Sequence, residues 1–322
     1  METNILETNI VRRSVENAIS GSSSVSIIFP RIQEVCSHLN ASDLTDSSWE
    51  FDLLQQFDKS HRFTLYLLFS SINFSFWDTP TWSITYRGRS HAASYGVMAA
   101  LVRSLEEGAP ITDWGYLSNI SPSDFGHIFR GNRTIPMFDE RVVIFREIGA
   151  SLIKHDIRNP QLLFPSNPSN LQRVINAIVD IFPSFNDIGE LNGNNVYFYK
   201  RAQLLSAKCM KLVMGTAFNH CADFFTVFAD YRLPQALRGM GVIKYNSELA
   251  TMIDNGELLK NGSREEIEIR CNTIWAGELI RRGLNSMSIN VSSIQIDSWL
   301  WRYAKTFENT LPPAHKVNTT FY

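Results

Sequence analysis

The chain has 322 residues, 44% of them hydrophobic and 19% charged, and a formal net charge of −2. That length and composition predict one large domain or two smaller ones, with enough apolar material for a core. Proteins that grip long stretches of DNA or RNA normally carry a basic excess, because phosphate contacts dominate their affinity. The near-neutral charge therefore argues against a broad nucleic-acid-binding face and favours a small ligand.

Apolar residues recur mostly at helical spacing, and strand-like stretches are scarce. Residues 63–77 (FTLYLLFSSINFSFW) predict a buried helix that runs into a buried polar turn, because the stretch is too short and too polar to span a bilayer. Short strands or a hairpin are predicted at 80–88 and 194–199. Further helices are predicted at 93–108, 139–155, 170–182, 199–215, 263–283 and 293–305. The sequence thus predicts an all-α or mostly α fold with a minor β element.

Local signals mark several of the predicted helix ends. Three glycines follow segments in which apolar residues recur at helical spacing, and helices commonly end at such glycines. They are Gly108, Gly215 and Gly283. Ser263 and Glu266 have the spacing of a capping box. The stretch LRGMGVIKY at 237–245 weakly resembles the glycine hairpin of helix-hairpin-helix proteins, although an ordinary helix stop explains it equally well.

The sequence contains none of the familiar nucleotide-binding, serine-hydrolase or zinc-protease motifs. Its histidines are dispersed and its four cysteines form no CxxC pair, so we predict neither a metal site nor a cofactor. Scattered cysteines are typical of a reducing compartment, and the N-terminal stretch lacks the apolar segment of a secretory signal. These observations predict a cytoplasmic protein, with the nucleus as a second compartment and no contact with a membrane.

An acid lies inside the aromatic and apolar stretch FADYRLPQ at 228–235. Phe228 and Asp230 point to the same side if this segment is extended. Pro234 biases Leu233 away from helix, so we expect the chain to turn there and begin a new helix. Asp230 is therefore either a capping residue or the chemical centre of a site.

A second acid, Asp297, lies in SIQIDSWLWRYAK at 293–305, a predicted helix with apolar residues on nearly every side. Such a helix is usually buried, and a buried carboxyl group must be paired, hydrogen-bonded or shifted in pKa. The alternative to a functional role is a structural ion pair with a nearby arginine.

A basic cluster, Tyr199, Lys200 and Arg201, falls at a predicted helix start. Helix N-terminal amides together with two cations can hold a phosphate. The alternative is a solvated basic turn.

Several stretches after about residue 60 match a known family in order: INFSFW (72–77), YRG (86–88), LEEGAPIT (105–112), FPSFND (182–187), FYKRAQLL (198–205), FADYRLPQALRGMGVIKY (228–245), NGSREEIEIR (261–270) and LWRYA (300–304). The pair FADYRLPQ and REEIEIR is the most specific part of the match. In these stretches the chain resembles the queuosine salvage proteins, N-glycosyl hydrolases that release the base queuine from queuosine 5′-monophosphate.

The resemblance implies a helical bundle similar to the helix-hairpin-helix DNA glycosylases. It also implies a single queuosine-salvage domain over residues 1–322, in which the first 60 residues or so are more variable. No site residue is assigned within that N-terminal stretch.

The resemblance also assigns site residues. It implies that Asp230 is the catalytic carboxylate, that Phe228 lines the base pocket and that Asp297 recognises the base or its cyclopentenediol arm. The chain departs from the family beside this second acid, where Ser298 replaces an aromatic residue and a nearby tryptophan is the candidate substitute. The full predicted substrate-binding set is Phe228, Tyr231, Arg232, Asp297, Ser298, Trp301, Tyr199, Lys200 and Arg201.

The chemistry explains why such a family needs two acids. Cleavage of an N-glycosidic bond gives the ribose oxocarbenium character, and a carboxylate near the anomeric carbon can stabilise that cation, capture it covalently or orient a water. We expect Asp230 to take one of these roles. A 7-deazaguanine lacks the N7 that ordinary purine hydrolases protonate, so the departing base needs a second polar anchor. Asp297 fits that need as an acceptor of ring N–H or amino hydrogens.

Three cations are candidates for the 5′-phosphate: Lys200, Arg201 and Arg232. Arg232 is equally a structural partner for Asp230 or for Glu266. The sequence does not choose between these roles.

Two other functions explain part of the same pattern. A non-catalytic queuine carrier needs an aromatic pocket with two acids, but neither a carboxylate beside C1′ of a ribose nor a phosphate site. A DNA glycosylase needs a basic face for duplex binding, which the near-neutral charge disfavours. The predicted partners are therefore the small molecules queuosine 5′-monophosphate and queuine, without direct polynucleotide binding, and the oligomeric state is left open.

Overall fold

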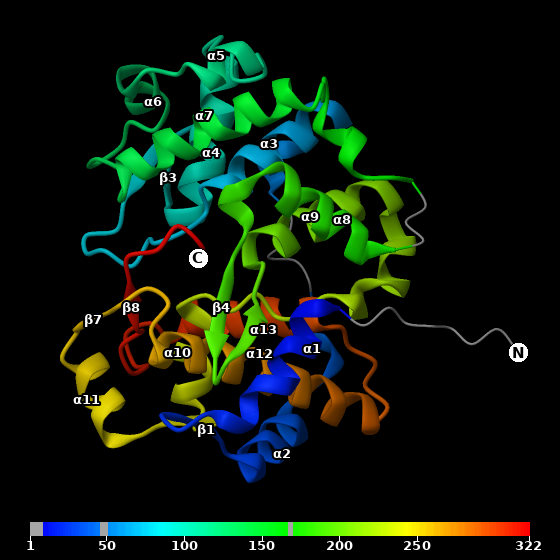
Figure 1. Ribbon diagram of the computed structural model, residues 1–322, viewed down its shortest axis with the longest axis vertical. Coiled ribbons are helices and arrows are strands. Elements are labelled where there is room, and N and C mark those ends of the chain that lie inside the picture. Colours follow the sequence, from blue (N-terminus) through cyan, green and yellow to red (C-terminus); the bar gives the residue numbers. More distant parts are fainter. Residues whose placement is uncertain (1–8, 46–50, 167–169) are drawn as a thin grey trace, which may run out of the picture.

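The chain is mostly helical in the computed structural model, which describes residues 9–45, 51–166 and 170–322 (Figure 1). This confirms the predicted mostly α fold with a minor β element. Every helix in the described residues falls short of the length and apolarity that crossing a bilayer demands. The α-helices are α1 (Ile10–Ala18), α2 (Phe29–His38), α3 (Lys59–Ser71), α4 (Ala93–Glu106), α5 (Trp114–Ser118), α6 (Pro122–Ile128), α7 (Phe138–Lys154), α8 (Leu171–Ile181), α9 (Lys200–Met214), α10 (Arg232–Gly239), α11 (Ser247–Asp254), α12 (Arg264–Ser286) and α13 (Ser293–Thr306).

The strands of the described residues pair into small two-stranded sheets. They are β1 (Val25–Ile27), β2 (Ser83–Tyr86), β3 (Arg89–Ala92), β4 (Ile188–Leu191), β5 (Asn194–Tyr197), β6 (Ile243–Tyr245), β7 (Leu258–Leu259) and β8 (Lys316–Val317). β2–β3 and β4–β5 are antiparallel hairpins, β1 pairs antiparallel with β6, and β7 pairs parallel with β8. The strands predicted within 80–88 and 194–199 are β2 and β5, each one arm of a hairpin.

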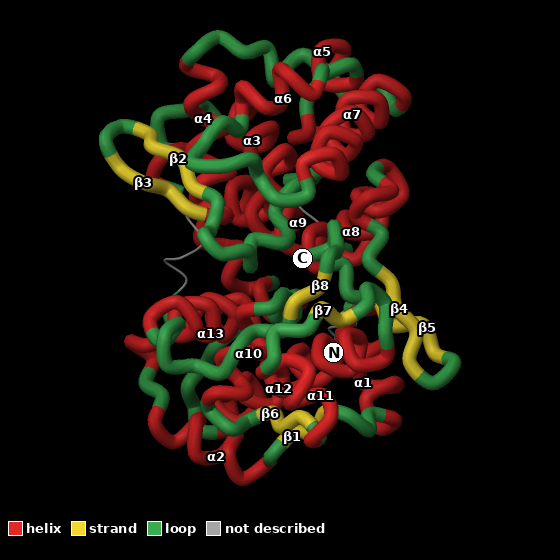
Figure 2. Tube along the Cα trace, turned by 90° about the vertical axis from the view of Figure 1, so that its left-hand side faces the viewer, coloured by secondary structure: helices red, strands yellow, loops and turns green. Residues whose placement is uncertain are grey.

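The helices form two groups that face each other across the middle of the molecule. α3 to α7 form the upper group in Figure 1, while α1, α2 and α10 to α13 form the lower group. α9 lies between the groups and contacts α3 and α8, and the long helix α12 contacts α1, α2, α10 and α13. The C-terminal end of the chain also lies between the two groups (Figure 2), so segments from distant parts of the sequence meet there.

Two of the predicted helix ends are confirmed and one is wrong. Gly108 follows α4 with a φ of +82°, and Gly215 ends α9 with a φ of +57°, conformations that glycine adopts without strain. α12, however, continues past Gly283 to Ser286. A Cβ atom at Gly283 would lie 2.8 Å from Sγ of Cys36 in α2. This glycine therefore allows two helices to pack closely and does not end one.

Only half of the predicted capping box forms at the start of α12. Ser263 Oγ accepts a hydrogen bond from Glu266 N (3.3 Å), as expected. The Glu266 carboxylate instead accepts a hydrogen bond from Gly262 N (2.8 Å) and pairs with Arg270 (3.4 Å). Glu266 is buried, so it belongs to an internal ionic network and not to an exposed cap.

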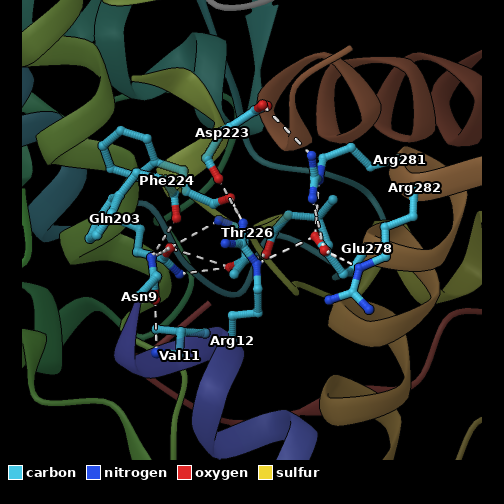
Figure 3. Close-up of polar contacts among 12 residues, drawn as sticks. Asn9, Val11, Arg12, Gln203, Asp223, Phe224, Thr226, Glu278, Arg281 and Arg282 are labelled. Carbon is cyan, nitrogen blue, oxygen red and sulfur yellow. Dashed lines mark hydrogen bonds and ion pairs between the residues drawn. The ribbon is translucent and has the colours of Figure 1, made fainter. Parts of the chain in front are cut away.

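The N-terminal helix α1 is held by polar contacts to three distant parts of the chain (Figure 3). Asn9, which is fully buried, donates from Nδ2 to Gln203 Oε1 of α9 and to Phe224 O, both at 3.1 Å. Arg12 pairs with Glu278 of α12 at 3.3 Å. The N-terminal stretch thus contains side chains that join α9, α12 and the segment before α10.

Candidate active site

A cavity of about 350 Å³ lies between the two groups of helices. Its walls come from residues 51–95, from α9, from residues 228–232, from α13 and from Tyr322. Polar and aromatic side chains that share it include Asn73, Lys200, Phe228, Asp230, Asp297 and Trp301. Both acids that the sequence singled out therefore line one cavity.

Asp230 has one oxygen fixed by the helix that follows it. Its Oδ1 accepts hydrogen bonds from Arg232 N (2.7 Å) and Leu233 N (3.1 Å) at the start of α10. Oδ2 accepts no hydrogen bond from the described residues. The two alternatives for this acid are therefore combined, because one oxygen caps a helix while the other is left for the cavity that Asp230 and Phe228 both line.

The expectation that Pro234 turns the chain at Leu233 is wrong. α10 begins at Arg232, so Leu233 is helical and Pro234 occupies the first turn. A proline is tolerated there because the first amides of a helix have no intrahelical partner. The Asp230 carboxylate takes the first two free amides, and this fixes the start of the helix ahead of the proline.

Asp297 is a buried acid with few partners. Its side chain on α13 is 8% exposed, and Oδ1 accepts a hydrogen bond from Phe228 N at 2.7 Å. Burial raises the pKa of Asp297 to about 8, the negative charge of Asp230 adds to the rise, and the Phe228 amide and Lys200 oppose it. This shift favours the protonated form of Asp297 at neutral pH.

Lys200 interacts electrostatically with both acids, Asp230 and Asp297. It is buried, and its Nζ donates to Asn73 O at 3.4 Å. Burial lowers the pKa of Lys200, while the charges of Asp230 and Asp297 oppose that shift. The ammonium group therefore belongs to the same charge cluster as the two carboxyl groups.

The amides at the start of α9 already have a partner inside the protein. The Asp187 backbone carbonyl accepts from Phe198 N (3.0 Å) and Tyr199 N (3.3 Å), and the Asp187 carboxylate accepts from Lys200 N at 3.4 Å. These three N–H groups are thus occupied by Asp187. They do not form the free anion site that the sequence suggested.

Tyr199 and Arg201 lie outside the lining of the cavity. The Arg201 guanidinium is buried and donates to Ser71 O and Ser184 O. Tyr199 is buried beside the ring of Tyr197, 5.5 Å between centroids. Of the basic pair at this helix start, only the lysine faces the cavity.

Arg232 lines the cavity, but its guanidinium has protein partners. It donates to Glu308 Oε1 (2.6 Å) and to Gln235 Oε1 (3.2 Å). The alternative of a pair with Glu266 is wrong, since Glu266 pairs with Arg270. The Arg232 guanidinium is therefore held in place by Glu308 and Gln235.

An aromatic side chain, that of Trp301, lies one turn after Asp297 on α13. Ser298 is buried, lies outside the cavity lining, and its hydroxyl has no hydrogen-bond partner among the described residues. Trp301 and Tyr231 line the cavity, whereas Trp299 does not. The Trp301 ring lies 6.0 Å from the ring of Tyr95, so this wall is aromatic.

Sequence reasoning missed several lining residues: Asn73, His91, Tyr95, Lys208, Lys305 and Tyr322. The stretch INFSFW contains Asn73 and was part of the family match, so one of them had a signal. Tyr322 had none, because it reaches the cavity through contacts between its backbone carbonyl and Ser75 N (2.8 Å). Within the described residues, no three His, Cys, Asp or Glu side chains are grouped as a metal site requires.

Comparison with known proteins places this architecture in a family. Residues 54–322 match the family model described as queuosine salvage protein. A protein of Sphaerobacter thermophilus named queuosine 5′-phosphate N-glycosylase/hydrolase is 32% identical over 97% of this chain and 96% of its own length. Proteins of the same name from Mus musculus and Bos taurus are 34% and 32% identical and cover 79% and 78% of this chain, and 80% and 79% of their own length. The chain therefore belongs to the queuosine salvage protein family.

Proposed function

We propose that this protein is an N-glycosyl hydrolase that cleaves queuosine 5′-monophosphate and releases queuine. The observation that carries the proposal is the arrangement of Asp230, which lines an aromatic cavity, with one carboxylate oxygen held by α10 and the other without a hydrogen-bond donor among the described residues. Family membership supports it, because a relative that matches almost the whole chain is named queuosine 5′-phosphate N-glycosylase/hydrolase.

Asp230 acts on the ribose in this proposal. As the bond from C1′ to the base nitrogen breaks, its electron pair leaves with the base and the ribose gains positive charge. The anchored carboxylate stabilises that charge, and it either bonds to C1′ or takes a proton from the water that does. Two backbone amides on Oδ1 keep the carboxylate in place without a change of geometry during the reaction.

Asp297 acts on the base. It holds a proton at neutral pH, so it can pass that proton to the base as the electron pair arrives there. The base then departs neutral, although a 7-deazaguanine offers no N7 for protonation. This role adds a proton donor to the acceptor role that the sequence suggested for Asp297.

The remaining lining residues hold the rest of the substrate. Phe228, Tyr231 and Trp301 supply apolar and aromatic walls for a planar base. Lys200 is the cation proposed for the 5′-phosphate, and Lys305 is a second cation on the same cavity. Remote phosphate binding helps to position the reacting ribose.

We also propose a single domain over 1–322 that is similar to the helix-hairpin-helix DNA glycosylases. α10 ends at Gly239, and Gly241, with a φ of +72°, lies in the turn that leads through β6 to α11. Contacts of α1 and α2 with α12 support one domain. All four cysteines are free thiols, which supports a cytoplasmic or nuclear location.

Turnover assays test the function directly. Queuosine 5′-monophosphate, the free nucleoside and a queuosine-containing oligonucleotide are compared, with release of queuine as the readout. We expect the monophosphate to have the highest kcat/KM. Queuine binding without turnover of any substrate would support the carrier, and preference for the oligonucleotide would support the DNA or RNA glycosylase.

A further inference from the structure

Arg270 is a buried arginine in the second turn of α12, and its guanidinium contacts two aromatic rings and two acids. Its side chain is 2% exposed, and its guanidinium carbon lies 3.8 Å from the ring centroid of Phe198 and 4.4 Å from that of Tyr322. Its terminal nitrogens donate to the Asp187 carboxylate at 2.9 and 2.5 Å. The planar fork of arginine matches a carboxylate in this two-bond geometry, which a lysine cannot reproduce.

Two of its contacts lie next to the proposed catalytic groups. Arg270 Nε donates to Ala229 O at 3.4 Å, and Ala229 directly precedes Asp230. Asp187, the main partner of the guanidinium, also accepts from Lys200 N at the start of α9. One guanidinium thus connects the backbone beside the cavity acid with the backbone of the cavity lysine, although these segments lie about 30 residues apart.

Stability alone does not account for this arrangement. A buried ion pair is weak evidence for stability, because apolar side chains of similar volume often replace one without loss. Substrate cleavage, in contrast, requires that reacting groups stay within about 0.5 Å of the productive geometry. A rigid, fully hydrogen-bonded arginine between the two segments meets that requirement.

We infer that Arg270 is a positioning residue that sets Asp230 and Lys200 at a fixed separation for cleavage of the glycosidic bond. The inference rests on the proposed function, since it assumes that Asp230 acts on the ribose. Arg270 is not in the cavity lining. It acts through Asp187 and Ala229.

The Arg270→Lys enzyme tests the inference, because it keeps a charge for Asp187 but loses the fork that also reaches Ala229. We expect kcat for queuosine 5′-monophosphate to fall by roughly 10–100-fold, since a misplacement near 1 Å can cost ~10²-fold, while KM and the Kd for queuine change less than about threefold. A structural role alone would lower the amount of folded enzyme and leave the kcat of the folded fraction unchanged.

Arg103→Lys is the matched control. Arg103 donates to the carbonyls of Ile128 and Arg130, both at 3.0 Å, and lies outside the cavity lining. We expect this variant to keep the wild-type kcat. Asp187→Asn is the second test, because it breaks the same ionic contact from the other side, and we expect the same loss of kcat at constant KM.

The outcomes separate the inference from the function on which it rests. Wild-type kcat in folded Arg270→Lys or Asp187→Asn enzyme overturns the positioning role, and so does failure of both variants to fold, which would assign these residues to stability. Asp230→Asn is measured in the same assay. If it stays active, the proposed function fails, whereas an inactive Asp230→Asn beside a fully active Arg270→Lys removes only the positioning role.

Discussion

Glu268 and Asp297 are two carboxyl groups buried to a similar degree, at 0% and 8% exposure, in very different surroundings. Glu268 accepts hydrogen bonds from the backbone of Ser23–Val25 at 2.9, 2.6 and 3.2 Å, and pairs with Arg264 at 2.8 Å. Within the described part of the chain, Asp297 accepts a single hydrogen bond, from Phe228 N, and it lines a cavity.

The contrast shows that burial alone does not identify a reactive acid. Where protein N–H groups replace the lost water, a carboxylate is stable and joins two segments of the chain. Where N–H groups do not replace the water, the acid keeps its proton or is left to contact a ligand. Burial then raises its pKa, as it does for Asp297. Asp230 lies between these cases, since only one of its oxygens is satisfied.

The largest effect is expected for Asp230→Asn. Its Oδ1 can still accept from the amides at the start of α10, so the fold should persist, but the charge that faces the ribose is lost. We expect kcat to fall by roughly 10²–10⁴-fold, measured as queuine released from queuosine 5′-monophosphate. Asp113→Asn is the control, because Asp113 Oδ1 caps α5 in the same way, at 2.8 Å from Gly115 N, away from the cavity. Substantial hydrolysis by a well-folded Asp230→Asn enzyme would leave this acid with the capping role only.

Glu268→Gln should have the next largest effect, on stability. The amide oxygen can take the place of Oε2, which accepts all three N–H bonds from Ser23–Val25, but it carries no charge, and the NH2 group would then face the Nε–H of Arg264. We expect the free energy of unfolding to fall by about 2–4 kcal/mol in denaturant titrations, as for a broken buried ionic contact. The half-exposed Glu265 of the same helix provides the control Glu265→Gln, with an effect near zero. If the two variants were equally stable, the hydrogen bonds and the ion pair of Glu268 would not stabilise the fold, and its contrast with Asp297 would not hold.

Lys200→Met should act on substrate choice. The variant keeps the length of the side chain but removes the charge proposed to hold the phosphate. We expect kcat/KM for the monophosphate to fall by roughly 10–100-fold, the size of a lost charged hydrogen bond, with a smaller loss for the free nucleoside. The exposed Lys244 gives the control Lys244→Met. An equal loss of kcat/KM for both substrates would show that another cation holds the phosphate. Lys305 would then be the next residue to replace.

The smallest effect is the pH dependence of stability through Asp297. Its folded pKa is about 8, whereas an unfolded aspartate titrates near ~3.9, so the native state binds the extra proton between these values. Stability from this group is complete below about pH 4 and is lost as pH rises to about 8. Asp297→Asn does not titrate, so its Tm should exceed that of the wild type by a few degrees at pH 9 and match it at pH 4. A Tm difference that does not change with pH would show that Asp297 is ionised throughout.

Local sequence signals predicted most helices and the glycine ends of α4 and α9, because those features depend on neighbouring residues. Gly283 was misassigned because its role depends on Cys36, which lies far away in the sequence. Leu233 was misassigned because a side chain outside the helix, that of Asp230, fixes where α10 begins. The first error thus has a distant cause, whereas the cause of the second lies three residues away, in a carboxylate whose effect outweighs that of the proline.

The candidate site was predicted in the same uneven way. FADYRLPQ and the apolar helix over 293–305 pointed to the two cavity acids. Lys200 and Arg201 could not be told apart, because successive helical residues point in directions about 100° apart and only the packing of α9 decides which one meets the cavity. That packing is set by Asp187, which no motif at the helix start reveals.

The contacts of Asn9 have a consequence for biosynthesis. Its partners Gln203 and Phe224 are translated 194 and 215 residues later, so most of the chain must be made before α1 can dock. Until then the apolar side chains of Val11 and Val15, fully buried in the finished protein, remain exposed on a nascent chain. Contacts this distant in sequence form slowly, and exposed apolar helices attract chaperones or aggregate. Docking of α1 is therefore a late step of folding, and it completes the support of the segment that leads to Asp230.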